Sequence, residues 1–263
     1  MRVHVALSPA DFAGLSLRGH TALVVDVLRA TTTVVAACAA GCPAIVPVAD
    51  PATALARAAR FRRGEALLAG EQGGEPIAGF DLGNSPLEYV TERVAGRTVI
   101  LTTTNGTAAM LLAQAAEAAA VAALVNVGAA AGWALARGRD VTVLCAGEEG
   151  TLALEDAVCA GLLVERIAAA CPSIELSDGA TAARRLGGYY EARMDRLRLD
   201  ARWARHLARR GRSADLDACL RLDATALVPV FDAGVIVPQP RAASGLAAAL
   251  GETGRWPDRE MTR

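Results

Sequence analysis

Short apolar runs alternate with longer amphipathic or alanine-rich stretches as far as Gly150. The apolar runs predict strands at Val3–Leu7, Ala22–Val27, Ala44–Val48, Ala66–Ala69, Thr98–Thr102, Val121–Val125 and Val141–Cys145. The stretches between them predict helices, among them Pro51–Arg62, Asn105–Ala118 and Val127–Arg137. Strands that alternate with helices of about 10–15 residues are typical of βαβ units. We therefore expect a three-layer α/β/α fold around a mainly parallel or mixed sheet.

The pattern becomes more helical after Gly150. Helices are predicted at Leu154–Ala170, Ser177–Gly188, Arg198–Arg210 and Ala214–Leu220, and a late strand pair at Ala226–Phe231 and Val235–Val237. We divide the chain into an α/β region, 1–150, a helix-rich continuation, 151–250, and a polar tail expected to fray, 251–263. The first two could equally form one domain, and the alanine-rich helices of the second could bury a homodimer face.

Composition excludes several kinds of chemistry. All 27 basic residues are arginine, so catalysis through a lysine Schiff base and phosphate binding by a P-loop lysine are both ruled out. The formal net charge of −1 gives no global field for nucleic acid, so we expect no nucleic-acid partner. With 53% hydrophobic and 4% aromatic residues, the core must be built mainly from Ala, Val and Leu.

Two further observations bear on location. A charge-free run, 118–136, is long enough to suggest a membrane span, but Asn126 and Gly128 interrupt it, so a short strand followed by a helix explains it better. The six cysteines form no C-x-x-C pair, and no secretory signal follows Met1. We expect a cytoplasmic protein that does not enter a membrane.

The stretch LVVDVLRATTTVV, Leu23–Val35, places chemistry where a strand gives way to a helix. Asp26 ends the strand, and the amides of Thr31, Thr32 and the next threonine would open the helix, where unpaired N–H groups favour anions. Arg29 adds a planar fork suited to phosphate oxygens. We take Asp26 and Arg29 as catalytic candidates and Thr31 and Thr32 as anion-binding candidates. The alternative is a capping carboxylate, a surface arginine and threonines that pack in the helix.

Two more clusters follow predicted strands. In GEQGGEPIAGFDLGNSPLEY, Gly70–Tyr89, the carboxylates of Glu71 and Asp81 offer hard oxygen ligands, and Asn84 and Ser85 offer polar contacts, although Ser85 before a proline also suits a helix cap. In LTTTNGTAAM, Leu101–Met110, the residues Asn105, Gly106 and Thr107 form a candidate anion-binding turn at the start of a helix. Asn-Gly is also a hairpin signal, but the helical pattern after it argues against a hairpin.

The fourth cluster is CAGEEGTLALEDAVCAG, Cys145–Gly161. Glu148 follows a strand and Asp156 opens the long helix; adjacent helical residues point about 100° apart, so we expect at most one of Glu155 and Asp156 to face a given site. Carboxylates grouped with a phosphate suit Mg²⁺. We therefore predict a metal-assisted phosphate site, with metal-ligand candidates Asp26, Glu71, Asp81, Glu148 and Asp156.

The four clusters, in this order and spacing, resemble the 2-phosphosulfolactate phosphatase family, also called the ComB family. The resemblance is strong from Val24 to Gly161 and looser over the last hundred residues. It implies a Mg²⁺-dependent phosphoric monoester hydrolase of three-layer α/β architecture. The implied reaction converts 2-phospho-3-sulfolactate into 3-sulfolactate and phosphate, a step towards coenzyme M. A small anionic phosphate ester would then be the partner.

One position departs from the family pattern. The second motif of the family usually begins Gly-Glu-Arg-Gly-Gly, and Gln72 stands here in place of the arginine. Arginine and glutamine are not equivalent for binding an anion. Two alternatives therefore stay open, a phosphatase for another phosphorylated 2-hydroxy acid and a non-catalytic small-anion-binding module. A phosphatase of the haloacid dehalogenase type would place a second aspartate at position 28, where Leu28 stands, so we disfavour that mechanism.

Overall fold

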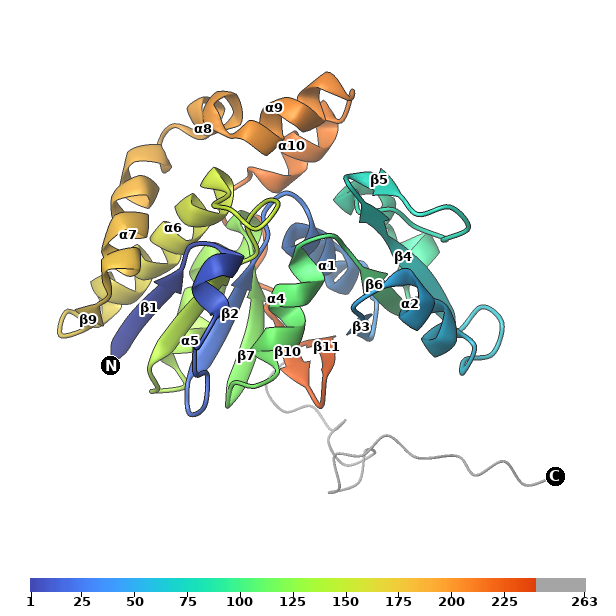
Figure 1. Ribbon diagram of the computed structural model, residues 1–263, viewed down its shortest axis with the longest axis horizontal. Coiled ribbons are helices and arrows are strands. Elements are labelled where there is room, and N and C mark those ends of the chain that lie inside the picture. The colour runs from blue at the N-terminus through green and yellow to red at the C-terminus, as the bar shows by residue number, and fades with distance from the viewer. Residues whose placement is uncertain (240–263) are drawn as a thin grey trace.

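The computed structural model describes residues 1–239, which form a sheet with helices packed against it (Figure 1). The strands are β1 (Arg2–Ala6), β2 (Thr21–Val25), β3 (Ile45–Pro47), β4 (Ala66–Gln72), β5 (Glu75–Pro76), β6 (Thr98–Thr102), β7 (Ala118–Ala122), β8 (Val141–Cys145), β9 (Glu175–Leu176), β10 (Pro229–Asp232) and β11 (Val235–Pro238). The α-helices are α1 (Ala30–Ala39), α2 (Pro51–Ala58), α3 (Thr91–Val94), α4 (Gly106–Ala113), α5 (Val127–Leu135), α6 (Leu154–Ala170), α7 (Asp178–Tyr190), α8 (Met194–Asp200), α9 (Arg202–Arg209) and α10 (Ser213–Cys219). The predicted α/β class with a helix-rich C-terminal part is confirmed.

The sheet is mixed and mostly parallel. Its order is β5-β4-β6-β3-β11-β10-β7-β2-β8-β1-β9. β4, β6 and β3 are parallel to one another, as are β7, β2, β8, β1 and β9. The antiparallel hairpin β10–β11 lies between these groups and pairs with β7 at Val230–Ala120 and with β3 at Ile236–Ile45. The late strand pair predicted from the sequence thus joins the two parallel groups.

The core lies on both faces of the sheet, because successive strand residues point to opposite sides. Val25 and Val143 pack in one cluster with side chains of α5, α6 and α7. Val24 and Leu144 pack in a second cluster with side chains of α1 and α4. The helices therefore cover two faces, as a three-layer architecture requires.

Several predicted elements differ in their bounds from the structure, and two of these differences have a visible local feature. The strand predicted at 121–125 lies at 118–122, because the amide of Asn126 bonds the backbone of Val121 and Ala123 and turns the chain there. The helix predicted at 198–210 is two helices that meet at Ala201, which has an extended backbone (φ −68°, ψ 128°). Within residues 1–239 no helix is long and apolar enough to span a membrane. The tail predicted at 251–263 lies outside the described residues.

Candidate active site

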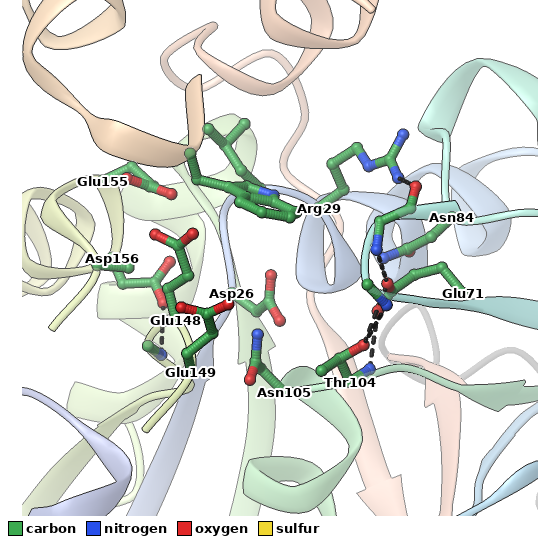
Figure 2. A pocket seen from close by; sticks show the side chains of 16 residues that line it. Asp26, Arg29, Glu71, Asn84, Thr104, Asn105, Glu148, Glu149, Glu155 and Asp156 are labelled. Carbon is green, nitrogen blue, oxygen red and sulfur yellow. Dashed lines mark hydrogen bonds between the residues drawn. The ribbon is translucent and has the colours of Figure 1, made fainter. Parts of the chain in front are cut away.

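One pocket collects polar residues that follow β2, β4, β6 and β8 (Figure 2). Its lining consists of Asp26, Leu28, Arg29, Glu71, Gly73, Gly74, Asn84, Thr104, Asn105, Gly147, Glu148, Glu149, Ala153, Glu155, Asp156 and Trp203. Seven of the residues proposed from the sequence are among them: Asp26, Arg29, Glu71, Asn84, Asn105, Glu148 and Asp156. The structure therefore brings parts of all four sequence clusters together.

Asp26 lies between the two sides of the pocket (Figure 2). Its Oδ1 accepts a hydrogen bond of 3.1 Å from the amide of Ala30, the first residue of α1. Burial raises the pKa of Asp26 to about 7, against the lowering effect of the Ala30 amide, and the charge of Glu71 raises it further. A carboxylate that is buried at the start of a helix and holds a proton near neutral pH is a strong candidate for a functional group.

An acidic side of the pocket comes from the β8–α6 loop and the start of α6. It carries Glu148, Glu149, Glu155 and Asp156, and Figure 2 shows them to the left of Asp26. Burial, with the charges of Glu148 and Asp26, raises the pKa of Glu155 to about 7. Burial and the charges of Asp26 and Glu155 also hold the pKa of Asp156 well above its usual range. Arg202 pairs with Glu148 and Glu149, so the acids without a cationic partner on this side are Glu155 and Asp156, whose pKa values are raised.

The two neighbouring acids of α6 have different tasks. Asp156 accepts the amides of Val27 (2.8 Å) and Gly147 (3.0 Å), so its two oxygens tie the β2–α1 and β8–α6 loops together. No other residue within 1–239 donates a hydrogen bond to the Glu155 carboxylate, which also lines the pocket. Both residues line the pocket, but only Glu155 has carboxylate oxygens that accept no backbone amide of another residue within 1–239. Glu155, which the prediction passed over, is the carboxylate with the freer oxygens.

The opposite side of the pocket offers hydrogen-bond donors. Arg29 and Asn84 lie there, and Asn105 lies directly below Asp26 in Figure 2. The buried Oδ1 of Asn84, an acceptor, has no hydrogen-bond partner within residues 1–239. Both Glu71 oxygens already accept hydrogen bonds, from the amides of Thr104 (2.7 Å) and Gly74 (2.6 Å) and from the Thr104 hydroxyl. Glu71 thus holds the β4 and β6 loops in place, whereas the arginine and the two asparagine side chains remain to meet a ligand.

Arg29 is held by a residue far along the chain. Its Nη1 lies 2.6 Å from Oδ2 of Asp215 on α10, and both side chains are buried. Its Nη2 donates to the carbonyl of Gly74 at 3.0 Å, and the hydroxyl of Ser85 donates to the second oxygen of Asp215 at 2.5 Å. Guanidinium has five N–H donors, so these two contacts fix the plane of Arg29 and leave donors for a ligand.

The remaining predicted residues lie outside the pocket lining. The hydroxyls of Thr31, Thr32 and Thr107 donate to the carbonyls of Asp26, Val27 and Thr103, so they stabilise the loops instead of facing the pocket. Ser85 contacts Asp215, as described above. Asp81 is exposed, and its carboxylate accepts the amide of Leu68 at 2.8 Å. In the structure these side chains therefore support the site or lie apart from it.

Gly106 supports the site through its size. A Cβ at this position would lie 2.6 Å from Oδ2 of Asp26 and 2.6 Å from the Cβ of Ala30. Only glycine therefore lets α4 approach the catalytic candidate so closely. The sequence placed Gly106 in an anion-binding turn, and the structure places it directly behind Asp26.

The sequence did not point to three residues that line the pocket or hold one of its side chains, namely Glu155, Trp203 and Asp215. Glu155 was set aside in favour of its neighbour, and Asp215 and Trp203 lie on helices whose patterns are those of ordinary amphipathic segments. Asp215 is conspicuous only in the folded protein, where this acidic residue is 4% exposed. No spacing rule reveals that burial from the sequence. Long-range pairs of this kind become visible only when the chain is folded.

The donor chemistry of the pocket can be compared with the needs of a metal ion. Within residues 1–239 no group of three His, Cys, Asp or Glu side chains is arranged to hold one. Mg²⁺, however, commonly uses one or two carboxylates and completes its shell with water and substrate phosphate. Asp26 and Glu155 are buried, mutually repelling carboxylates whose charge such a cation would relieve. The residues present therefore fit Mg²⁺ held by few protein ligands.

Comparison with known proteins places the chain in a family. The family profile described as 2-phosphosulpholactate phosphatase matches residues 8–234. A "Probable 2-phosphosulfolactate phosphatase" of Deinococcus radiodurans is 42% identical over 90% of this chain and 96% of its own length. Two further relatives have the same name. The protein of Symbiobacterium thermophilum is 40% identical over 89% of this chain and 98% of its own length, and that of Gloeobacter violaceus is 39% identical over 82% of this chain and 90% of its own length. The chain belongs to the 2-phosphosulfolactate phosphatase family, a family of phosphoric monoester hydrolases.

Proposed function

We propose that this protein hydrolyses 2-phospho-3-sulfolactate to 3-sulfolactate and phosphate, with Mg²⁺ as cofactor. The observation that carries the proposal is the two-sided pocket, with buried carboxylates on one side of Asp26, Arg29 and Asn84 on the other, and Asn105 below it (Figure 2). A cation on the acidic side and a phosphate ester beside the donors would complement each other in charge. The relatives' name, probable 2-phosphosulfolactate phosphatase, supports the choice of substrate.

The roles of the residues follow from their contacts. Asp26 and Glu155 would hold Mg²⁺, with Glu148 beside them, and the bound metal supplies Lewis-acid polarisation of the phosphoryl group. Arg29 donates its remaining N–H groups to phosphoryl oxygens, in an orientation that Asp215 fixes. Asn84 and Asn105 orient the ester through their amides. Preorganised donors of this kind stabilise charge that develops on a transferring phosphoryl group.

The replacement at Gln72 bears on the substrate. Gln72 is exposed at the end of β4 and is absent from the pocket lining, so its side chain makes no contact in the described site. An arginine is longer than glutamine, and the adjacent Gly73 and Gly74 line the pocket, so an arginine at position 72 has the reach to supply a donor that this chain lacks. Phospholactate is therefore the informative comparison, because it lacks the sulfonate that such a donor would bind.

Phosphate release by the purified protein tests the proposal. Three esters, namely 2-phospho-3-sulfolactate, phospholactate and an aryl phosphate, are compared with Mg²⁺ and with EDTA. The proposal predicts release that requires the metal and is fastest with the sulfonate. Turnover of phospholactate alone would show a phosphatase for another phosphorylated 2-hydroxy acid. No release from any ester would favour a non-catalytic anion-binding module.

A further inference from the structure

Helix α9 contacts both sides of the pocket mouth. At its first residue, Arg202 pairs with Glu148 and with Glu149 on the acidic side, each at 2.9 Å. At the next residue, Trp203 lines the pocket and packs against Gly74 on the opposite side. In Figure 1, α9 and α10 lie above the sheet at the same end as α1. One short helix therefore joins loops that are far apart in the sequence.

The position of the Trp203 ring is fixed from two directions. A Cβ on Gly74, whose φ is +87°, would lie 3.1 Å from Cζ2 and 3.3 Å from Cη2 of the indole. On the other side the ring of His206 stacks on Trp203, with centroids 4.4 Å apart and planes 9° from parallel. The indole therefore lies between Gly74 and His206, in contact with both.

The space left beneath this ring is small. The cavity volume is about 70 Å³, well below the roughly 300–1,000 Å³ of pockets for drug-sized ligands. Trp203 is the only aromatic side chain among the lining residues within 1–239. A flexible aliphatic ester can adapt its shape to a small pocket, whereas a rigid planar aromatic group cannot bend away from the indole.

We propose that Trp203 is a specificity-determining residue that favours phosphate monoesters with a flexible aliphatic group over those with a rigid aromatic one. This inference rests on the proposed function and deepens it. The indole lies beside Gly74 in the pocket lining and excludes rigid planar leaving groups by shape, since 3-sulfolactate and p-nitrophenol are similar in size. The ion pair of Arg202 with the acidic side keeps the helix that carries the indole in place.

Substrate selectivity of variants tests this role. The ratio of kcat/KM for 2-phospho-3-sulfolactate to kcat/KM for p-nitrophenyl phosphate is measured in wild type, Trp203→Ala and Trp203→Phe. We expect Trp203→Ala to lower the ratio at least tenfold, mainly by faster aryl turnover, and Trp203→Phe to lower it less. Tyr189→Ala, which removes an exposed aromatic ring from α7, is the matched control and keeps the ratio. An unchanged ratio in a folded Trp203→Ala would overturn the proposal.

A binding measurement covers the case in which Trp203→Ala does not fold. Tryptophan emission is titrated with inorganic phosphate in the presence of Mg²⁺, for wild type and Trp203→Phe. The proposal expects a saturable change in wild type that the variant lacks, and an equal change in both would overturn it. Absence of turnover of every ester by wild type would instead refute the proposed function, and the titration would still decide on Trp203.

Discussion

Asp215→Ala removes the carboxylate that pairs with Arg29 inside the protein. The Arg29 side chain is 2% exposed and that of Asp215 is 6% exposed, so water cannot replace the lost partner easily. Ser85 loses its acceptor at the same time. The variant therefore leaves a buried, uncompensated cation next to the pocket.

The cost can be set against known magnitudes. Breaking a buried ion pair by removing one partner destabilises a protein by about 3–5 kcal/mol. For a chain of this size each kcal/mol lowers the melting temperature by roughly 2–4 °C, which gives a decrease of the order of 10 °C. Activity should fall as well, because the Arg29 fork is no longer held towards the substrate.

Urea and thermal unfolding measure the effect, with Asp217→Ala as the matched control. Asp217 lies on the same helix and pairs with Arg198, but its side chain is 66% exposed. Exposed pairs contribute about 0–1 kcal/mol, so this variant should unfold nearly as the wild type does.

A decrease of less than about 1 kcal/mol in the free energy of unfolding of Asp215→Ala would contradict this prediction, because a loss that small matches an exposed ion pair. A double variant adds a second check. Arg29→Met with Asp215→Leu removes both charges and should be more stable than Asp215→Ala alone, since no unpaired charge remains inside. Equal loss in the two proteins would show that packing, and not charge, sets the effect.

Three further predictions concern the pocket. Gly106→Ala should lower the free energy of unfolding by roughly 1–3 kcal/mol in thermal unfolding, because the new Cβ meets Asp26 and Ala30; an unchanged stability would contradict the packing. Glu155→Gln should slow phosphate release at least about 100-fold. The control Glu165→Gln, which changes an exposed ion pair on the same helix, should leave the rate unchanged. Equal rates for the two variants would show that Glu155 has no part in the reaction. In EDTA the free energy of unfolding should fall as pH rises from 5 to 8, because Asp26 and Glu155, with pKa raised to about 7, keep protons in the folded chain that the unfolded chain has released. Urea titrations across this range would show a flatter slope for Asp26→Asn, and an unaltered slope would exclude Asp26 as a cause.

The sequence predicted the architecture because apolar runs and helical stretches alternate clearly up to Gly150. The long helix at 154–170 is found as predicted, whereas the split at Ala201 was missed, since alanine favours helix and the break depends on carbonyls that accept from Arg205. The shift of β7 had a similar cause, a side-chain amide that bonds the backbone locally.

The site was predictable as far as it follows strand ends. Asp26, Arg29 and Glu148 were found because polar residues after buried strands gather at one place. Asp215 and Trp203 were not, because their roles come from contacts with residues 186 and 129 positions earlier in the chain, Arg29 and Gly74. The three threonines after Arg29 are residues that commonly bind anions, yet their hydroxyls donate hydrogen bonds to backbone carbonyls.

We propose that the carboxylate side and the arginine side of one pocket hydrolyse a phosphate ester together. Mg²⁺-dependent phosphate release from 2-phospho-3-sulfolactate is measured for wild type and Asp26→Asn, with calorimetric binding of the same ester to both. We expect turnover by wild type, a large loss of rate in the variant and binding that is largely kept. Equal release by the two proteins, or no release by wild type with the ester bound, would show that the pocket does not act in this way.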